Sequence, residues 1–208
     1  MKKIAIIGAG ISGLYFANLL EMDSGFDYKI YEKRRILNLD ESYGIQLSVN
    51  SIKLLNKIGF KNLAASEISC PNKVNFFDAK NKDKICDIDI TRFNEESNRY
   101  TTLKRSTLIK FLLEKVPDSK IIYNIELKNV EYMEKLNTSF SNNITENFDY
   151  IVVSDGVFSN TKSIIKRKDI GPKFFKSVAL RGNLKTHNNS DISIFMGPNF
   201  HFVIYPVN

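Results

Sequence analysis

The chain has 208 residues, of which 43% are hydrophobic and 25% charged, a composition typical of one large globular domain or two modest ones. This composition excludes an intrinsically disordered chain and a fibrous one. The net charge of +7 permits binding to nucleic acid or to an anionic membrane, but the lysines are scattered and no run of five like charges occurs. We ascribe the charge to the Lys-, Asn- and Ile-rich composition that AT-rich codons produce, and we expect no nucleic-acid partner.

The cysteine and histidine residues indicate the redox compartment and whether a metal site is expected. Cys70 and Cys86 form no CxxC pair, which favours a reduced, cytoplasmic protein. His187, in a polar loop stretch, is given no role, and no spacing of His and Cys predicts a metal site. The N-terminal apolar run is broken at Gly8 and no apolar segment reaches ~18 residues, so we expect no export signal and no transmembrane helix.

The first forty residues predict a strand, a glycine-rich turn, a helix and a second strand. Residues 3–7 are a short apolar run typical of a buried strand in a parallel sheet. The run leads into a G-x-G-x-x-G sequence at residues 8–13, and a helical pattern extends from Ile11 to Leu20. Residues 27–31 indicate the second strand, with Glu32 at its end. This order is the context in which such glycines bind a dinucleotide.

Each residue of the turn has a physical reason. Gly8 permits the tight turn, Gly10 lets the backbone approach a pyrophosphate, and Gly13 allows close packing of helix and strand. The helix N-terminus at Ile11 and Ser12 offers free N–H groups and the positive end of the helix dipole to phosphates.

The acid after the second strand refines the expected ligand. The Glu32 carboxylate is placed to accept ribose hydroxyls and would repel a 2′-phosphate, so NADP is disfavoured at this site. The fingerprint alone does not separate NAD from FAD. The basic residues that follow, Lys33, Arg34 and Arg35, either reach phosphates or lie on a solvated loop.

Further along, turn and cap signals predict alternating strands and helices. Residues 44–49 alternate as a half-buried strand does, and Asn50 or Ser51 is expected to cap a helix that Gly59 ends. Residues 74–78 and 84–90 predict a hairpin.

The middle of the chain predicts a second helix, a loop and another strand. Ser106 or Thr107 is expected to cap a helix that stops before Pro117. Residues 137–147 are polar and indicate a hairpin loop. Residues 151–153 predict another buried parallel strand.

Two ligand candidates stand next to these elements. Asp155-Gly156 lies at the carboxyl edge of the strand at residues 151–153, where α/β sheets bind ligands, although a plain turn explains this pair too. Arg105 precedes the helix over residues 106–116 and is a candidate anion contact, the alternative being a surface arginine.

The last third of the chain predicts strands at residues 177–184, 192–196 and 201–205. His201 and Tyr205 are an even number of residues apart, so both are expected on one face of a sheet. His201 suits proton transfer near neutral pH. The alternatives are a structural strand histidine and a packed tyrosine with a satisfied hydroxyl.

Several separate stretches together resemble one family, the FAD-dependent aromatic-ring monooxygenases of the salicylate hydroxylase type. The stretches are G-x-G-x-x-G with Glu32, Gly44–Phe60 (similar to "GxGIxLxxNxxxxLxxLG"), Leu103–Leu108, the Asp-Gly motif in Asp149–Ser159, the "xAxRG" strand Val178–Gly182, and Met196–Pro206 (similar to "GpxxHxxxYP"). The resemblance extends along the whole chain and corresponds to the N-terminal portion of such proteins. The Gly-Asp-Ala segment that members carry further on does not occur in the 208 residues.

The resemblance implies a fold, a reaction and cofactors. The fold class is α/β: a Rossmann-like FAD/NAD(P)-binding domain with a parallel sheet in three layers, residues 1–73 and 99–172, and a partial antiparallel-sheet substrate domain, residues 74–98 and 173–208. NADH or NADPH would reduce FAD, and a hydroperoxyflavin would hydroxylate a phenolic or benzoate-like aromatic substrate with O2. By resemblance Arg105 and Asp155 contact the cofactor, and His201 and Tyr205 meet the substrate.

Two alternatives remain open at the level of sequence. One is another FAD-dependent oxidoreductase of the same superfamily, of the reductase or halogenase type. The other is an FAD-binding fragment without turnover. The sequence names no substrate, and it leaves a homodimer open.

Overall fold

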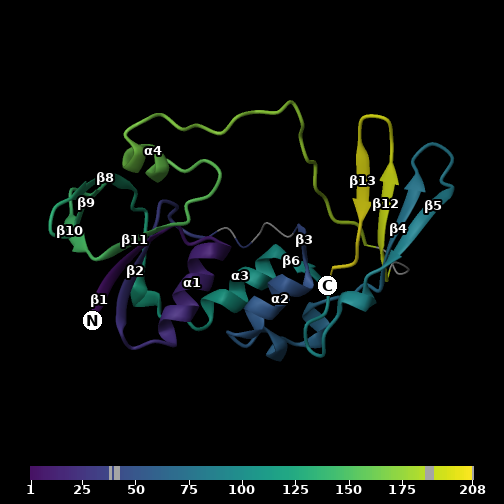
Figure 1. Ribbon diagram of the computed structural model, residues 1–208, viewed down its shortest axis with the longest axis horizontal. Helices are drawn as coiled ribbons and strands as arrows, with labels where there is room; N and C mark the ends of the chain where they lie inside the picture. The colour runs from purple at the N-terminus through teal and green to yellow at the C-terminus, as the bar shows by residue number, and fades with distance from the viewer. Residues whose placement is uncertain (38, 40–42, 186–189, 208) are drawn as a thin grey trace. The chain divides into compact units, whose positions relative to one another are not determined.

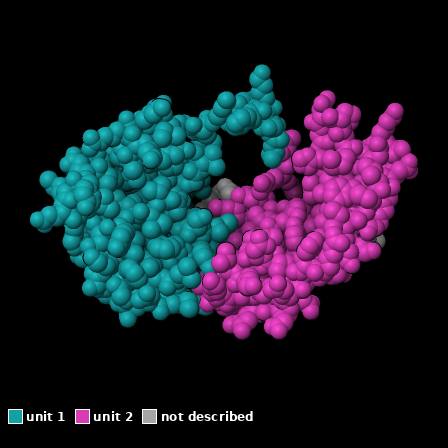
Figure 2. Space-filling view, viewed as in Figure 1, with its two compact units in different colours: residues 1–39, 109–179 teal, residues 40–108, 180–208 magenta. Residues whose placement is uncertain are grey.

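The structure is a computed structural model that describes residues 1–37, 39, 43–185 and 190–207. The chain divides into two compact units, and each unit is made of two separate segments (Figures 1 and 2). Unit 1 contains residues 1–39 and 109–179, and unit 2 contains residues 40–108 and 180–208. The predicted flavin-binding and substrate-binding domains have boundaries that differ from those of these two units. That division by function stays a prediction.

Unit 1 is built on a parallel sheet of four strands in the order β11-β1-β2-β7. The strands are β1 (Lys2–Ile7), β2 (Phe26–Glu32), β7 (Ile121–Tyr123) and β11 (Tyr150–Val153). The predicted strands at both ends of the fingerprint are therefore confirmed. The expectation that β11 is buried is wrong, because β11 is an edge strand with only one neighbour and Val153 is 41% exposed.

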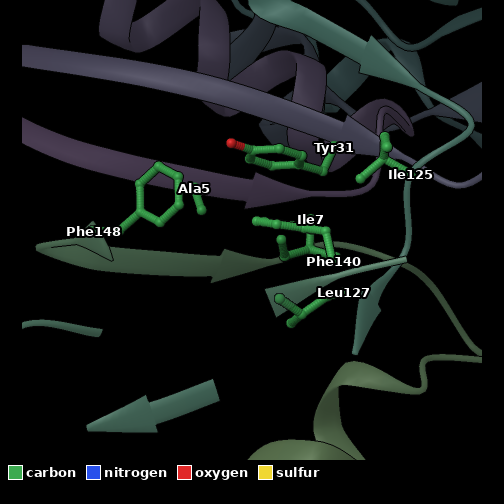
Figure 3. Close-up of a cluster of buried hydrophobic side chains, with 7 residues drawn as sticks. All are labelled: Ala5, Ile7, Tyr31, Ile125, Leu127, Phe140 and Phe148. Atoms are coloured by element: carbon green, nitrogen blue, oxygen red, sulfur yellow. The ribbon is translucent and has the colours of Figure 1, made fainter. Parts of the chain in front are cut away.

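A three-stranded antiparallel sheet covers one face of the parallel sheet. It consists of β8 (Leu127–Tyr132), β9 (Leu136–Phe140) and β10 (Thr145–Phe148). The side chains that meet between the two sheets form a buried apolar cluster (Figure 3), and these are Ala5, Ile7, Tyr31, Ile125, Leu127, Phe140 and Phe148. The predicted loop at residues 137–147 is wrong at both ends, because Thr138 and Phe140 are buried and pair in strands while only the turn at 141–144 is a loop.

The opposite face of the parallel sheet carries Ile4, Ile6 and Ile30 by strand alternation, and α1 (Ile11–Glu21) supplies buried Leu14 and Ala17. Helix, parallel sheet and antiparallel sheet make the predicted three layers (Figure 1).

Two further helices lie in the second half of the chain. Helix α3 is Arg105–Leu113 and α4 is Thr161–Lys166. Because α3 already begins at Arg105, Ser106 and Thr107 lie inside its first turn, and the prediction that one of them caps it is wrong. The helix ends before Pro117, as predicted.

Unit 2 contains an antiparallel pair next to a short helix. The pair is β3 (Gly44–Leu47) with β6 (Thr101–Lys104). Helix α2 (Val49–Asn56) starts after Ser48, whose backbone is extended, so Asn50 and Ser51 lie within the helix and are not its caps. Gly59 has φ +88°, which suits glycine and ends the helical segment as predicted.

The second sheet of unit 2 is mixed, in the order β13-β12-β4-β5. Its strands are β4 (Lys73–Asp78), β5 (Lys84–Asp89), β12 (Ile192–Met196) and β13 (His201–Ile204), and its central pair, β12 with β4, is parallel while both outer pairs are antiparallel. The hairpin and the last two strands are confirmed.

The predicted strand at residues 177–184 is wrong. These residues pair with no strand in the part of the chain that the structure describes, and their apolar side chains lie in solvent, with Leu180 93% exposed. Short 3-10 helices complete the described elements: Phe60–Asn62, Ala65–Glu67, Thr91–Phe93 and Asp118–Lys120.

Candidate cofactor site

The candidate site lies in unit 1, at the carboxyl ends of β1 and β11. Gly8 has φ +102°, and a Cβ at this position would lie 2.6 Å from the backbone oxygen of Ser154. A Cβ on Gly13 would collide with the Gly8 oxygen and come 2.7 Å from Ser154 Oγ. The first and third glycines are therefore required by the fold itself, as the sequence predicted. Around Gly10 the nearest atom to a Cβ would be 4.0 Å away, which leaves room for a ligand.

Ser154, which directly follows β11, holds the turn in place through hydrogen bonds, and the sequence did not predict this role. The Ser154 hydroxyl lies 2.9 Å from the oxygen of Ile7 and 3.0 Å from that of Gly8, and donates its hydrogen to them. Helix α1 begins directly after Gly10, and its first internal bond is Leu14 N–H to Gly10 oxygen. The N–H groups of Ile11 and Ser12 thus have no acceptor within the helix and face the end at which an anion is favoured.

Glu32 fixes the same turn from the other side. Its side chain is 8% exposed; Oε2 accepts a hydrogen bond from Ala9 N–H at 2.8 Å, and Oε1 accepts one from Arg34 N–H at 2.9 Å. The acid that was predicted to hold a ribose is thus also a structural link between the turns after β1 and β2. Each carboxylate oxygen keeps a lone pair for a further donor.

Asp155 has a buried acceptor atom that a ligand could satisfy. Its Oδ2 accepts hydrogen bonds from the Thr161 hydroxyl at 2.8 Å and from Thr161 N–H at 3.3 Å. Its Oδ1 is buried and has no hydrogen-bond partner among the residues that the structure describes. A buried acceptor without a donor is unfavourable, so a ligand that brings a hydroxyl or N–H group would stabilise it.

A pocket of about 320 Å³ opens beside Asp155. Its lining residues are Ser12, Val153, Ser154, Asp155, Gly156, Ser159 and Lys162. Of these, Ser159 and Lys162 were not predicted, and no sequence pattern marks them. Ser159 precedes α4, Lys162 lies in its first turn, and the Ser159 hydroxyl oxygen accepts a hydrogen bond from Lys162 N–H at 3.3 Å. A lysine, hydroxyls and a helix N-terminus suit phosphate, and the free Asp155 oxygen suits a hydroxyl, so these residues fit a dinucleotide.

Three other predicted cofactor contacts, Lys33, Arg34 and Arg105, are not among the residues that line this pocket. Lys33 and Arg34 are exposed on the turn after β2, and the oxygen of Arg34 accepts a hydrogen bond from Asn124 N–H. Arg105 belongs to unit 2, where its guanidinium lies 5.9 Å from the ring centre of Tyr43.

His201 and Tyr205 also belong to unit 2. His201 begins β13 opposite Met196 and is exposed. Tyr205 follows the last residue of that strand, and its hydroxyl donates a hydrogen bond to the Gly44 oxygen at 2.6 Å. Burial raises the pKa of Tyr205, and the nearby Arg181 opposes that shift. His187 lies outside the described residues.

Two negative findings apply to the described part of the chain. No helix within it is long and apolar enough to cross a membrane. It also brings together no group of three or more His, Cys, Asp or Glu side chains that could hold a metal ion.

Comparisons with known proteins agree with this geometry. Residues 6–39 match the family described as NAD(P)-binding Rossmann-like domain. Over 99% of this chain, the sequence is 24% identical to 3-amino-4-hydroxybenzoate 2-monooxygenase of Streptomyces cremeus, of which it covers 53%. The chain thus spans about half the length of the curated relatives it matches.

Solved structures show the same fold. HpxO of Klebsiella pneumoniae, complexed with FAD and uric acid, matches with a TM-score of 0.78 at 15% identity, over 99% of this chain and 53% of that one. A salicylate hydroxylase substrate complex matches with a TM-score of 0.79 at 17% identity, over 99% and 53%. The predicted fold class and the resemblance to FAD-dependent monooxygenases are confirmed.

Proposed function

We propose that this chain is the FAD-binding, N-terminal part of a monooxygenase that consumes NADH or NADPH and hydroxylates a phenolic or benzoate-like small molecule. The observation that carries the proposal is the buried Asp155 oxygen without a donor, in a pocket lined also by Ser12 of α1. The names of the relatives support the reaction, since one acts on a hydroxybenzoate and one structural neighbour is a salicylate hydroxylase.

In this proposal the chain's own residues bind and orient the cofactor. The N–H groups of α1 and the Lys162 ammonium hold the phosphates, while Glu32 and Asp155 accept hydrogen bonds from hydroxyl groups. FAD, when bound, would supply the two-electron chemistry that activates O2. The protein's part is to place the cofactor and to exclude competing reactions.

Substrate activation is proposed for unit 2. The exposed imidazole of His201 is free to take a proton from a phenol, which makes the ring more electron-rich. The Tyr205 hydroxyl already donates its hydrogen to Gly44, so it can only accept from a substrate in this arrangement.

The test is a flavin titration of the chain and two alanine variants. Gly10→Ala adds a methyl group where the nearest protein atom is 4.0 Å away, so the fold tolerates it while the ligand's closest approach is blocked. Gly171→Ala, at a position with nothing within 4 Å, is the matched control. We expect FAD to bind the parent chain and the control, and to bind Gly10→Ala at least about tenfold more weakly, with equal melting temperatures.

Failure takes two distinct forms. If FAD does not bind, or binds Gly10→Ala as well as the parent chain, the proposed site is wrong. If FAD binds as expected but NADH and NADPH are not oxidised with any of a panel of phenols and benzoates, the chain is a flavin-binding fragment without turnover, the alternative that the sequence left open.

A further inference from the structure

Residues 166–178 of unit 1, the last residue of α4 and the chain that follows it, concentrate positive charge. Asp169 is the one acid among them, and five residues are basic, which gives the segment a net charge of +4. More than half of the chain's net charge of +7 therefore lies in this short stretch. None of the basic residues forms an ion pair with any residue that the structure describes, and these are Lys166, Arg167, Lys168, Lys173 and Lys176.

Three large apolar side chains of the same segment lie in solvent. Phe174 is 71% exposed, Phe175 76% and Val178 79%. Single exposed apolar side chains are common on protein surfaces, but a group of them marks a surface that binds another molecule. Lys173 and Lys176 flank the two phenylalanines, and Lys173 Nζ lies 5.6 Å from the ring centre of Phe175. The segment thus presents apolar and cationic groups together.

The backbone of the segment is tied to the fold near its start and is free beyond that point. Ile170 N–H donates a hydrogen bond to the Ser163 hydroxyl oxygen of α4 at 3.0 Å. Residues 171–179 are all exposed, and none of them forms a hydrogen bond with a residue that the structure describes. In Figure 1 this yellow-green stretch runs on from α4 without helix or strand. It can therefore adapt to a flat surface without breaking contacts of the fold.

An anionic membrane matches these features better than other partners do. Its headgroups attract lysine and arginine, and the boundary with the acyl chains accommodates apolar side chains while the backbone stays hydrated. A second copy of the chain would bring the same positive charge and be repelled. Bases of single-stranded nucleic acid would stack on Phe174 and Phe175 but leave Val178 in water.

We propose that residues 166–178 dock unit 1 onto the surface of an anionic phospholipid membrane. The basic side chains bind headgroups, and Phe174, Phe175 and Val178 enter the boundary with the acyl chains. None of these residues lines the cofactor pocket, so the inference does not rest on the proposed function. Lys162, which does line the pocket, is one helical turn from Lys166 in α4, so docking brings the candidate cofactor site close to the membrane.

The test is cosedimentation of the full 208-residue chain, without flavin, with phosphatidylcholine vesicles that contain about 30% phosphatidylserine. We expect binding that weakens as sodium chloride is added and that is at least about tenfold weaker on pure phosphatidylcholine. Phe174→Ala combined with Phe175→Ala should weaken binding at least about tenfold, because apolar burial is lost. Tyr132→Ala, which removes an exposed ring from the same unit, is the matched control and should bind like the parent chain.

A second pair of variants tests the position of the charge. Lys176→Gln should weaken binding about fivefold, the contribution of one basic residue at an anionic surface. Lys110→Gln lowers the net charge equally at an exposed position of α3 and should change binding by less than about twofold. Equal melting temperatures of all variants show that folding is not the cause.

Several results would overturn the proposal. The chain binds neither kind of vesicle, or the phenylalanine variant binds like the parent chain, or Lys176→Gln and Lys110→Gln weaken binding equally. A smaller mass of the phenylalanine variant than of the parent chain, in analytical ultracentrifugation without vesicles, would assign the segment to a contact between copies. Displacement of the vesicles by a single-stranded oligonucleotide would assign it to nucleic acid. Because flavin is absent, these outcomes are independent of the flavin titration.

Discussion

Glu32 is expected to stabilise the fold of unit 1 even without a cofactor. Its buried carboxylate accepts one hydrogen bond from Ala9 N–H and one from Arg34 N–H, at 2.8 and 2.9 Å. In Glu32→Ala both N–H groups lose their acceptor. In Glu32→Gln one oxygen remains as acceptor, but the amide NH2 faces the other N–H donor, so one hydrogen bond is lost and two donors are opposed.

The size of the effect follows from the number of donors left without a partner. A buried polar group without a partner costs about 1–3 kcal/mol. Glu32→Ala leaves two such groups and should lower the free energy of unfolding by about 2–6 kcal/mol, and Glu32→Gln should lower it by about 1–3 kcal/mol. Urea unfolding of the flavin-free chain, followed by circular dichroism, measures both. Glu114→Gln, at an exposed position of the same unit, is the matched control and should change stability by less than about 0.5 kcal/mol.

The result distinguishes a structural role of Glu32 from a role in ligand binding alone. If Glu32→Ala unfolds at the same urea concentration as the parent chain, the carboxylate is not a structural link, and its only role is toward a ligand. In that case the argument from the two hydrogen bonds is refuted, and the loss should appear in flavin affinity alone.

Two further results are expected. Gly44→Ala should lower the stability of unit 2 by about 1–3 kcal/mol, because the added Cβ would lie 2.6 Å from the ring of Tyr205, which is anchored to this residue; Gly171→Ala is the control, and equal melting temperatures would contradict the packing argument. The hydrogen bond from Lys120, opposed by partial burial, lowers the pKa of Asp27, so this pair stabilises the fold above the unfolded pKa of the carboxyl, and the gain is lost as pH falls through the folded one. Lys120→Met should therefore cost up to about 1 kcal/mol at neutral pH and less at about pH 2, in urea titrations at both values. An equal difference at both would count against the ion pair.

The elements that sequence predicted best are those in which local pattern and tertiary packing agree. The apolar run of β1, the glycines and the following helix all serve one buried strand–turn–helix unit, so periodicity alone locates them. The strand at residues 177–184 failed for the opposite reason. Its alternation of apolar residues is real, but a strand requires a neighbour to complete its hydrogen bonds, and sequence does not show whether one is present.

The candidate site was also predictable only in part. The turn residues follow from backbone requirements, which a sequence displays directly, as at Gly8 with its positive φ. Ser154 and Lys162 act through contacts that depend on the pairing of β11 with β1, so only the structure reveals them. Helix caps failed because the polar residues at 50, 51, 106 and 107 lie one or two positions inside the helices that they were expected to begin.

The contacts of the glycine turn explain why its fingerprint does not by itself name the cofactor. Ser154, directly after β11, holds the turn from one side through the Ile7 and Gly8 oxygens, and Glu32 of β2 holds it from the other through Ala9 N–H. The acid at the end of β2 thus has a hydrogen-bond partner within the turn, whichever nucleotide is bound. Evidence for a particular cofactor must come from groups that the fold leaves unsatisfied, and in this pocket that group is Asp155 Oδ1.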